Sequence, residues 1–224
     1  MSKQIIHVFR HAEAYHNAQK NVLIPDPHLT AKGNKQAERI PDTYPFFNRP
    51  TLILVSPTKR CIQTAMLACD PVLNNRASEH FDQLPRMIAL PHLQEVSEHP
   101  CDTGSPLSRI KGEYGNWVEF PEDLFTSEEW YVKKGTDFAA DDKLVAKRAE
   151  FVRSFILDCP DREIIVVTHG AFSDFLVNRW LYGPGCGTLF DGFPDNASGI
   201  PLKIVSTEEG THLEREIPKW YSPD

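Results

Sequence analysis

Three short polar clusters contain residues that could bind and transfer a phosphoryl group. They are Arg10-His11, Ser56-Pro57-Thr58-Lys59-Arg60 and Thr168-His169-Gly170. Each cluster follows a run of apolar residues that predicts a buried strand. Because open α/β sheets bind ligands beyond the carboxyl ends of their strands, we expect the arginines and histidines of these clusters to meet there. The forked guanidinium group matches the geometry of phosphoryl oxygens, so the clusters together predict an anion site.

Alternating strands and helices are predicted along the chain. The strands are Ile5 to Phe9, Thr51 to Val55, Arg86 to Leu90 and Glu163 to Thr168, with a closing hairpin of Leu202 to Ser206 and His212 to Glu216. Helices are expected from Thr30 to Ile40, Thr58 to Cys69, Asp141 to Leu157 and Ala171 to Leu181, followed by a loop from Gly183 to Gly199. This order predicts a three-layer α/β/α fold with a mostly parallel central sheet.

Helix ends are predicted from capping residues and prolines. Thr30 is expected to cap the first helix and Pro41 to stop it, while Ser56-Pro57 should begin the second and Asp70-Pro71 end it. The helix of Asp141 to Leu157 is expected to turn one apolar face to the sheet. That face comprises Leu144, Val145, Phe151, Val152, Phe155 and Ile156.

A long irregular stretch from Pro91 to about Ala139 is the least regular part of the pattern. It carries several aromatic residues among prolines and acidic residues, so we expect short helices that pack over the core. A lid over the site and a purely structural insertion remain equal alternatives. The length of 224 residues predicts a single domain, 1–224, that carries this insertion at about 91–139.

Composition and charge limit the classes of partner. The chain is 41% hydrophobic and 25% charged, with a formal net charge of -7 and no basic cluster. Nucleic-acid binding is therefore not expected. The five cysteines show no repeated spacing, which favours reduced thiols and a cytoplasmic location. We expect neither a signal peptide nor a membrane span. The oligomeric state cannot be inferred from the sequence.

The ordered motifs resemble those of the histidine phosphatase superfamily, also called the phosphoglycerate mutase-like superfamily. They extend to about Gly170 in the order of that family. The motifs are Arg10-His11-Ala12-Glu13 with Asn17, Leu29-Thr30 with Gly33 and Gln36-Ala37, Ser56-Pro57 with Arg60 and Gln63-Thr64-Ala65, Leu93-Gln94-Glu95, and Thr168-His169-Gly170. The resemblance implies a phosphoglycerate mutase-like fold. Ala12 stands where many relatives have glycine, and we expect little effect on chemistry.

The resemblance also implies roles for individual residues. His11 would attack phosphorus to form phosphohistidine, with no metal or other cofactor. Binding of the phosphoryl group would fall to Arg10, Arg60, His169 and Asn17, of which Asn17 could equally cap a turn. Glu95 is the expected general acid and base, with Asp102 as the alternative.

These roles predict a histidine acid/base phosphatase, a phosphomonoesterase that hydrolyses a small-molecule phosphate ester. The asparagine-glutamate-arginine signature of glycolytic mutases is absent around Glu95, which favours a phosphatase over the alternative mutase. A non-catalytic protein that binds phosphorylated ligands is the third reading. The residues His92, His99, Cys101 and Asp102 are possible metal ligands, but their spacing fits no standard zinc pattern, so ordinary loop roles are expected. His7 is expected to be packed within its strand.

Overall fold

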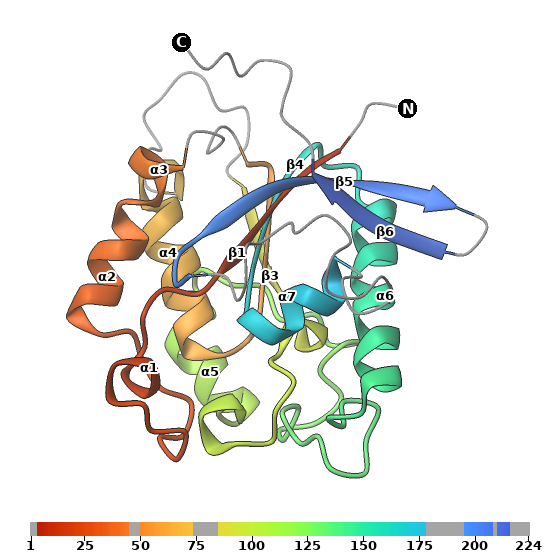
Figure 1. Ribbon diagram of the computed structural model, residues 1–224. Coiled ribbons are helices and arrows are strands. Elements are labelled where there is room, and N and C mark those ends of the chain that lie inside the picture. Colours follow the sequence, from red (N-terminus) through yellow and green to blue (C-terminus); the bar gives the residue numbers. More distant parts are fainter. Residues whose placement is uncertain (1–3, 45–49, 74–84, 178–194, 208–209, 216–224) are drawn as a thin grey trace.

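A computed structural model describes residues 4–44, 50–73, 85–177, 195–207 and 210–215. Six strands form one sheet in the order β3-β2-β4-β1-β5-β6. The strands are β1 (Ile5–Arg10), β2 (Leu52–Val55), β3 (Arg86–Ala89), β4 (Glu163–Thr168), β5 (Gly199–Thr207) and β6 (Gly210–Arg215). The first four are parallel, and β5 and β6 are added as the predicted antiparallel hairpin. The mostly parallel sheet is confirmed (Figure 1).

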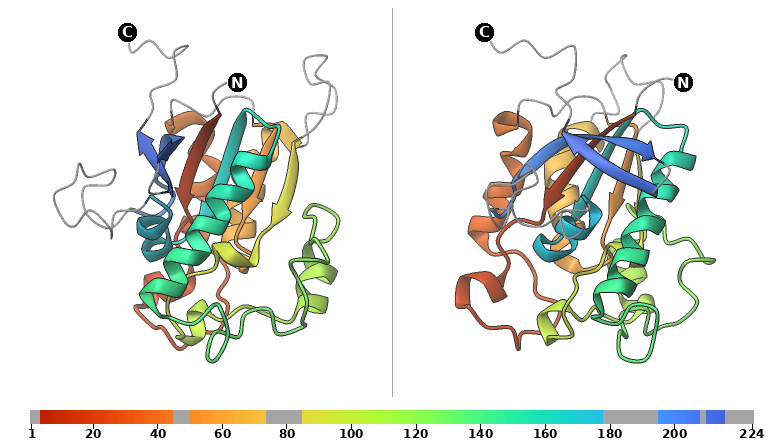
Figure 2. Two further views of the ribbon diagram at one scale, coloured as in Figure 1. Left: turned by 90° about the vertical axis from the view of Figure 1, so that its right-hand side faces the viewer. Right: turned by 45° about the vertical axis from the view of Figure 1, so that its right-hand side comes forward.

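Helices cover both faces of the sheet, as a three-layer fold requires. In the left view of Figure 2, α6 (Asp142–Asp158) crosses in front of the strands, and α2 (Ala31–Glu38) and α4 (Lys59–Leu73) lie behind them. Side chains alternate along each strand, so Phe9, Val55 and Val167 join the core under α4, while Val8, Leu54 and Val166 join the core under α6.

The helix boundaries differ from the predictions at two prolines. Thr30 caps α2 as expected, since its hydroxyl accepts a hydrogen bond from the Gly33 N–H. Pro41, however, does not stop helical structure; it lies in the first turn of α3 (Ile40–Thr43), where its missing N–H costs no hydrogen bond. Likewise α4 continues through Asp70-Pro71 to Leu73.

The buried face of α6 is only partly the predicted one. Val145, Val152 and Ile156 are fully buried, but Phe151 is 37% exposed. Two arginines, Arg148 and Arg153, take buried positions on the same face, each only 3% exposed. The prediction was therefore wrong to include Phe151 in the buried face and to leave out the two arginines, because a pattern of apolar residues alone excludes arginine.

The stretch from Pro91 to Ala139 contains the short helices that were predicted. They are η1 (Pro91–Leu93), η2 (Pro100–Asp102) and α5 (Leu107–Tyr114). The segment extends the hydrophobic core, with Ile110, Val118, Phe125 and Trp130 all buried. Glu119 also pairs with Ile88 of the edge strand β3. These contacts favour a structural role for much of the stretch.

Beyond β4 the chain enters α7 (Gly170–Leu176). The predicted continuation of this helix to Leu181 and most of the glycine-rich loop lie outside the described residues. In Figure 1, the short helix α1 (Tyr15–Gln19) and α5 lie at the lower end of the molecule, toward which the parallel strands run. Within the described chain, no helix is both long and apolar enough to span a bilayer.

Candidate active site

The pairing of β1 with β4 brings the first and third polar clusters together. Arg10 is directly opposite Thr168 in the parallel register, and the His11 N–H donates to the Thr168 carbonyl over 2.9 Å. His11 and His169 follow these residues, and their rings lie 5.3 Å apart between centroids. The second cluster joins them because β2 pairs with β4 and the Ser56 N–H donates to the Val167 carbonyl.

Arg60, in the first turn of α4, connects the three clusters through its side chain. Its Nε donates to His11 Nε2 over 3.1 Å, and its Nη2 lies 3.0 Å from His169 Nδ1. The same guanidinium forms an ion pair with Asp102 at 2.8 Å and donates to the Cys101 carbonyl. Arg60 is fully buried, so these bonds fix its position. The predicted convergence of residues 11, 60 and 169 is therefore present.

The contacts of His11 define its tautomer. His11 Nδ1 lies 2.8 Å from the Ala12 carbonyl oxygen, which can only accept, so Nδ1 carries the hydrogen. Nε2 is then left with a lone pair. Burial, and next the neighbouring charge of Arg60, hold the pKa of His11 well below its usual value, so the ring is neutral near pH 7. An unprotonated ring nitrogen is what a histidine nucleophile requires.

His169 lies fully buried between polar partners from both other clusters. Its Nδ1 accepts from Arg60, so its Nε2 carries the hydrogen and donates to the Ser56 hydroxyl over 2.8 Å. Ser56, predicted as a helix cap, therefore orients a site histidine. Burial and the Arg60 charge also hold the pKa of His169 well below its usual value.

Glu95 follows η1 and lies against the start of α7. Its carboxylate accepts hydrogen bonds from the backbone N–H groups of Val96, Ala171 and Phe172, at 2.9, 3.2 and 2.9 Å. Burial raises the pKa of Glu95 above its ordinary value, and the nearby Asp102 carboxylate raises it further. Arg10, at the end of β1, is electrostatically coupled to this carboxylate. Glu95 is thus a buried carboxyl group near the cluster, with a pKa raised in the direction that proton donation requires.

Asp102, the alternative acid, has other partners. One carboxylate oxygen pairs with Arg60, and the other accepts from the Ser97 hydroxyl over 2.6 Å. Lys133, a buried residue that sequence reasoning missed, donates to the Asp102 carbonyl over 2.7 Å. Burial lowers the pKa of Lys133 to about 8. These contacts suit Asp102 to holding Arg60 rather than to exchanging protons.

Comparison with known proteins bears directly on this constellation. The family model described as histidine phosphatase superfamily (branch 1) matches residues 6–214. The chain belongs to this superfamily. No curated protein matches the chain. Its relationship to this superfamily places it among phosphatases and phosphotransferases.

Solved structures share the histidine phosphatase fold at low sequence identity. The mycobacterial glucosyl-3-phosphoglycerate phosphatase complexed with VO3 is 18% identical, with a TM-score of 0.57 over 96% of this chain and 98% of that one. The ecdysone phosphate phosphatase from Bombix mori, in complex with tungstate, is 16% identical, with a TM-score of 0.57 over 99% and 96%. A mutant phosphoserine phosphatase from Entamoeba histolytica, in complex with phosphoserine, is 15% identical, with a TM-score of 0.52 over 94% of both chains.

In this histidine phosphatase superfamily member, Asn17 has a local structural role. Its Oδ1 accepts from the Ala14 N–H at the start of α1, and its Nδ2 lies 3.0 Å from His16 Nε2. The His16 ring is 5.8 Å from that of His11. Burial lowers the pKa of His16 to about 4. His16 is therefore a third histidine beside His11 and His169.

Residues outside the cluster occupy structural positions. His7 is buried and contacts the Tyr44 hydroxyl and Glu163. His92 stacks on Phe151 at 3.7 Å between centroids. In the part of the chain that the structure describes, no group of three or more His, Cys, Asp or Glu residues could hold a metal ion.

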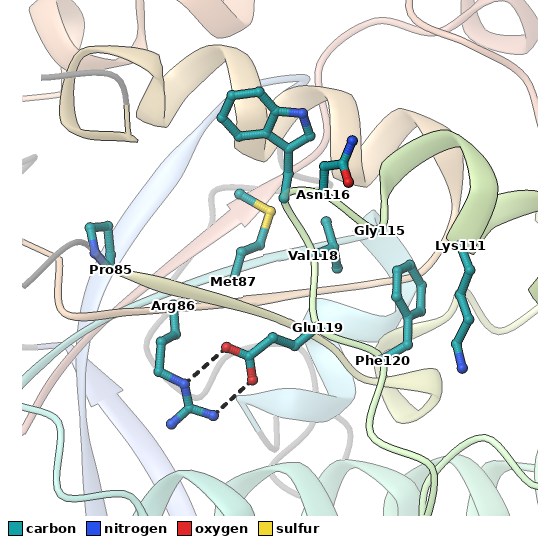
Figure 3. A pocket seen from close by; sticks show the side chains of 10 residues that line it. Pro85, Arg86, Met87, Lys111, Gly115, Asn116, Val118, Glu119 and Phe120 are labelled. Atoms are coloured by element: carbon teal, nitrogen blue, oxygen red, sulfur yellow. Dashed lines mark hydrogen bonds and ion pairs between the residues drawn. The ribbon is translucent and has the colours of Figure 1, made fainter. Parts of the chain in front are cut away.

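A separate cavity of about 510 Å³ lies beside the edge strand β3, and its lining includes neither His11 nor His169. Figure 3 shows its lining, which includes Met87, Lys111, Val118 and Phe120. The Arg86 guanidinium pairs there with the Glu119 carboxylate at 3.1 and 3.0 Å. Both side chains are mostly exposed, and no residue lining this cavity belongs to the predicted site.

Proposed function

We propose that this protein is a phosphomonoesterase that hydrolyses small-molecule phosphate esters through a phosphohistidine on His11. The observation that carries the proposal is the Arg60 guanidinium, which joins His11 Nε2 and His169 Nδ1 in one buried cluster. A neutral imidazole beside two arginines combines a nucleophile with an anion site. We also propose a single domain over residues 1–224 and a cytoplasmic location.

In the first step His11 Nε2 attacks phosphorus, and the bond from phosphorus to the ester oxygen breaks. The lone pair that now accepts from Arg60 Nε goes to phosphorus, so the guanidinium transfers its hydrogen bonds to phosphoryl oxygens. Arg10 and His169 contribute to the same oxygens, and Glu95 donates a proton to the leaving oxygen. A bound phosphate dianion raises the pKa of His169 and favours its protonated form.

In the second step Glu95, now a carboxylate, removes a proton from water that attacks the phosphohistidine. The phosphorus–nitrogen bond breaks, and His11 returns to its neutral form with inorganic phosphate released. Asp102 keeps Arg60 in place through both steps by means of their ion pair. Asn17 orients the start of α1 and the His16 ring beside the site.

Hydrolysis is favoured over the mutase alternative by the residues around Glu95, which lack the signature of glycolytic mutases. The compared structures are named as phosphatases for a glucosyl phosphoglycerate, an ecdysone phosphate and phosphoserine. A non-catalytic binding protein would need no general acid, whereas Glu95 is held at the cluster by three backbone N–H groups.

The purified protein is expected to release phosphate from p-nitrophenyl phosphate at an unchanged rate when EDTA is present. The reason is that His11, Arg60 and His169 supply the nucleophile and the positive charge that a metal ion would otherwise provide. Phosphate release and nitrophenol release are measured together. Loss of activity in EDTA, with recovery on adding a divalent metal, would contradict the metal-free mechanism; nitrophenol without free phosphate would indicate transfer to another acceptor.

A further inference from the structure

We propose that Arg148 of α6 is a positioning residue for Glu95: it fixes the backbone that holds the carboxyl group and stabilises the carboxylate formed when the proton is donated. The proposal rests on the proposed role of Glu95 as general acid. Arg148 lies on the opposite side of the sheet from Arg60 and is only 3% exposed. Burying a guanidinium is costly unless its charge is compensated, so its position calls for a partner.

Arg148 contacts the two backbone segments from which Glu95 obtains its orientation. Its Nη1 donates to the Gln94 carbonyl, directly before Glu95, over 2.8 Å. Its guanidinium carbon lies 4.6 Å from the centre of the Phe172 ring. The Phe172 N–H is itself a donor to Glu95 Oε1. One buried side chain therefore connects the residue before the acid with the start of the helix that binds it.

The remaining donors of Arg148 are available to a negative charge. Its Nε and Nη2 have no hydrogen-bond partner among the described residues. Burial lowers the pKa of Arg148 to about 10, and the charge interaction with Glu95 partly opposes this decrease. A cation that lies near the carboxyl group without a direct ion pair stabilises the carboxylate without occupying either of its oxygens.

Several other charged or titratable groups face Glu95 from the elements around it. They are Arg10 of β1, Arg60 and Cys61 of α4, Asp102 of η2 and Lys133 of the following segment. Among the described residues, Arg148 makes no hydrogen bond to His11, His169 or the Asp102 carboxylate, whereas Arg60 bonds to all three. Replacement of Arg148 should therefore change proton transfer more than phosphate binding.

The matched control is Arg153, also on α6 and also 3% exposed. It pairs with Glu150 at 2.6 Å and donates to the Phe175 and Leu176 carbonyls at the far end of α7. Arg148→Met and Arg153→Met remove the same kind of buried guanidinium from the same helix. A loss that comes only from disturbed packing should appear in both variants.

Arg148→Met is expected to lower kcat for an alkyl phosphate by about tenfold or more, and to change KM and p-nitrophenyl phosphate turnover by less than about threefold. The basic limb of its pH–rate profile should move up by about one pH unit, because the loss of a nearby cation raises the pKa of Glu95. Arg148→Lys restores the charge and should return that limb. Arg153→Met should have the same basic limb as the parent protein and the same ratio of turnover rates for alkyl and aryl phosphates.

Two further measurements separate this proposal from the proposed function. In a Glu95→Gln background, Arg148→Met should cause no additional loss, because its effect acts through the missing carboxyl group. Titration of Glu95 by carbon-13 NMR in the resting protein should give a midpoint raised by about one unit in Arg148→Met only. That experiment needs no turnover, so it remains decisive if the parent protein proves inactive as a phosphatase. Equal midpoints in Arg148→Met, Arg153→Met and the parent would overturn the proposal, as would additive losses in the double variant.

Discussion

Replacing His11 with alanine is expected to reduce turnover of every phosphate ester by about three orders of magnitude or more. The reason is that covalent catalysis needs the unprotonated ring nitrogen of His11, Nε2, as the nucleophile. His169 is not expected to substitute for it, because bound phosphate favours the protonated form of His169, which has no free lone pair on its ring. Steady-state assays with alkyl and aryl phosphates measure the loss.

His212→Ala provides the matched control for this variant. His212 lies on β6 and contacts Glu214, so its loss removes an imidazole without affecting the site. The control should retain full activity. Circular dichroism and vanadate binding check that His11→Ala remains folded and keeps its anion site. A folded His11→Ala variant with more than about a tenth of parent activity would assign the nucleophile to another residue.

Replacing Glu95 with glutamine is expected to lower kcat/KM for alkyl phosphates by about 10²- to 10⁴-fold. Alkoxides are poor leaving groups and need the proton that Glu95 carries. The loss should be about tenfold or less for p-nitrophenyl phosphate, whose leaving group departs without protonation. A series of esters with graded leaving-group pKa measures this difference. An equal loss across the series would show that Glu95 acts only in binding or structure.

The pH dependence of kcat/KM should reflect the opposite shifts of the two groups. The pKa of His11 is lowered, so the neutral, nucleophilic ring persists to pH values well below the ordinary pKa of histidine. The acid limb of the profile should therefore lie below that ordinary pKa. The pKa of Glu95 is raised, so its acidic form persists above the ordinary carboxyl range and activity falls as pH increases through that value. In Glu95→Gln the basic limb should disappear because glutamine does not titrate.

The fold and the central cluster were predictable because they depend on short-range sequence signals. Buried apolar runs before Arg10, Ser56 and His169 define strands, and parallel strands necessarily bring their carboxyl ends to one edge. Thr30 shows how a cap can be inferred from a single residue and its neighbours. The motif order supplied Glu95, whose acidic and irregular surroundings alone would have indicated an exposed side chain.

The supporting residues could not be predicted because their roles depend on contacts between distant segments. Asp102, which pairs with Arg60, lies 42 positions further along the chain. Lys133, from the following segment, donates to the Asp102 carbonyl. Ser56 has the sequence context of a helix cap, yet its hydroxyl contacts His169 across the sheet. Arg148 interrupts an apolar pattern, which sequence reasoning reads as an exposed position rather than as a buried charge.

The most direct test of the proposed mechanism is rapid-quench trapping of the phosphoenzyme. The protein is mixed with excess p-nitrophenyl phosphate, quenched in alkali within milliseconds, digested and analysed by mass spectrometry. We predict a base-stable, acid-labile phosphate on the peptide that contains His11, and none in His11→Ala. Turnover with no such adduct at any quench time would contradict the covalent mechanism.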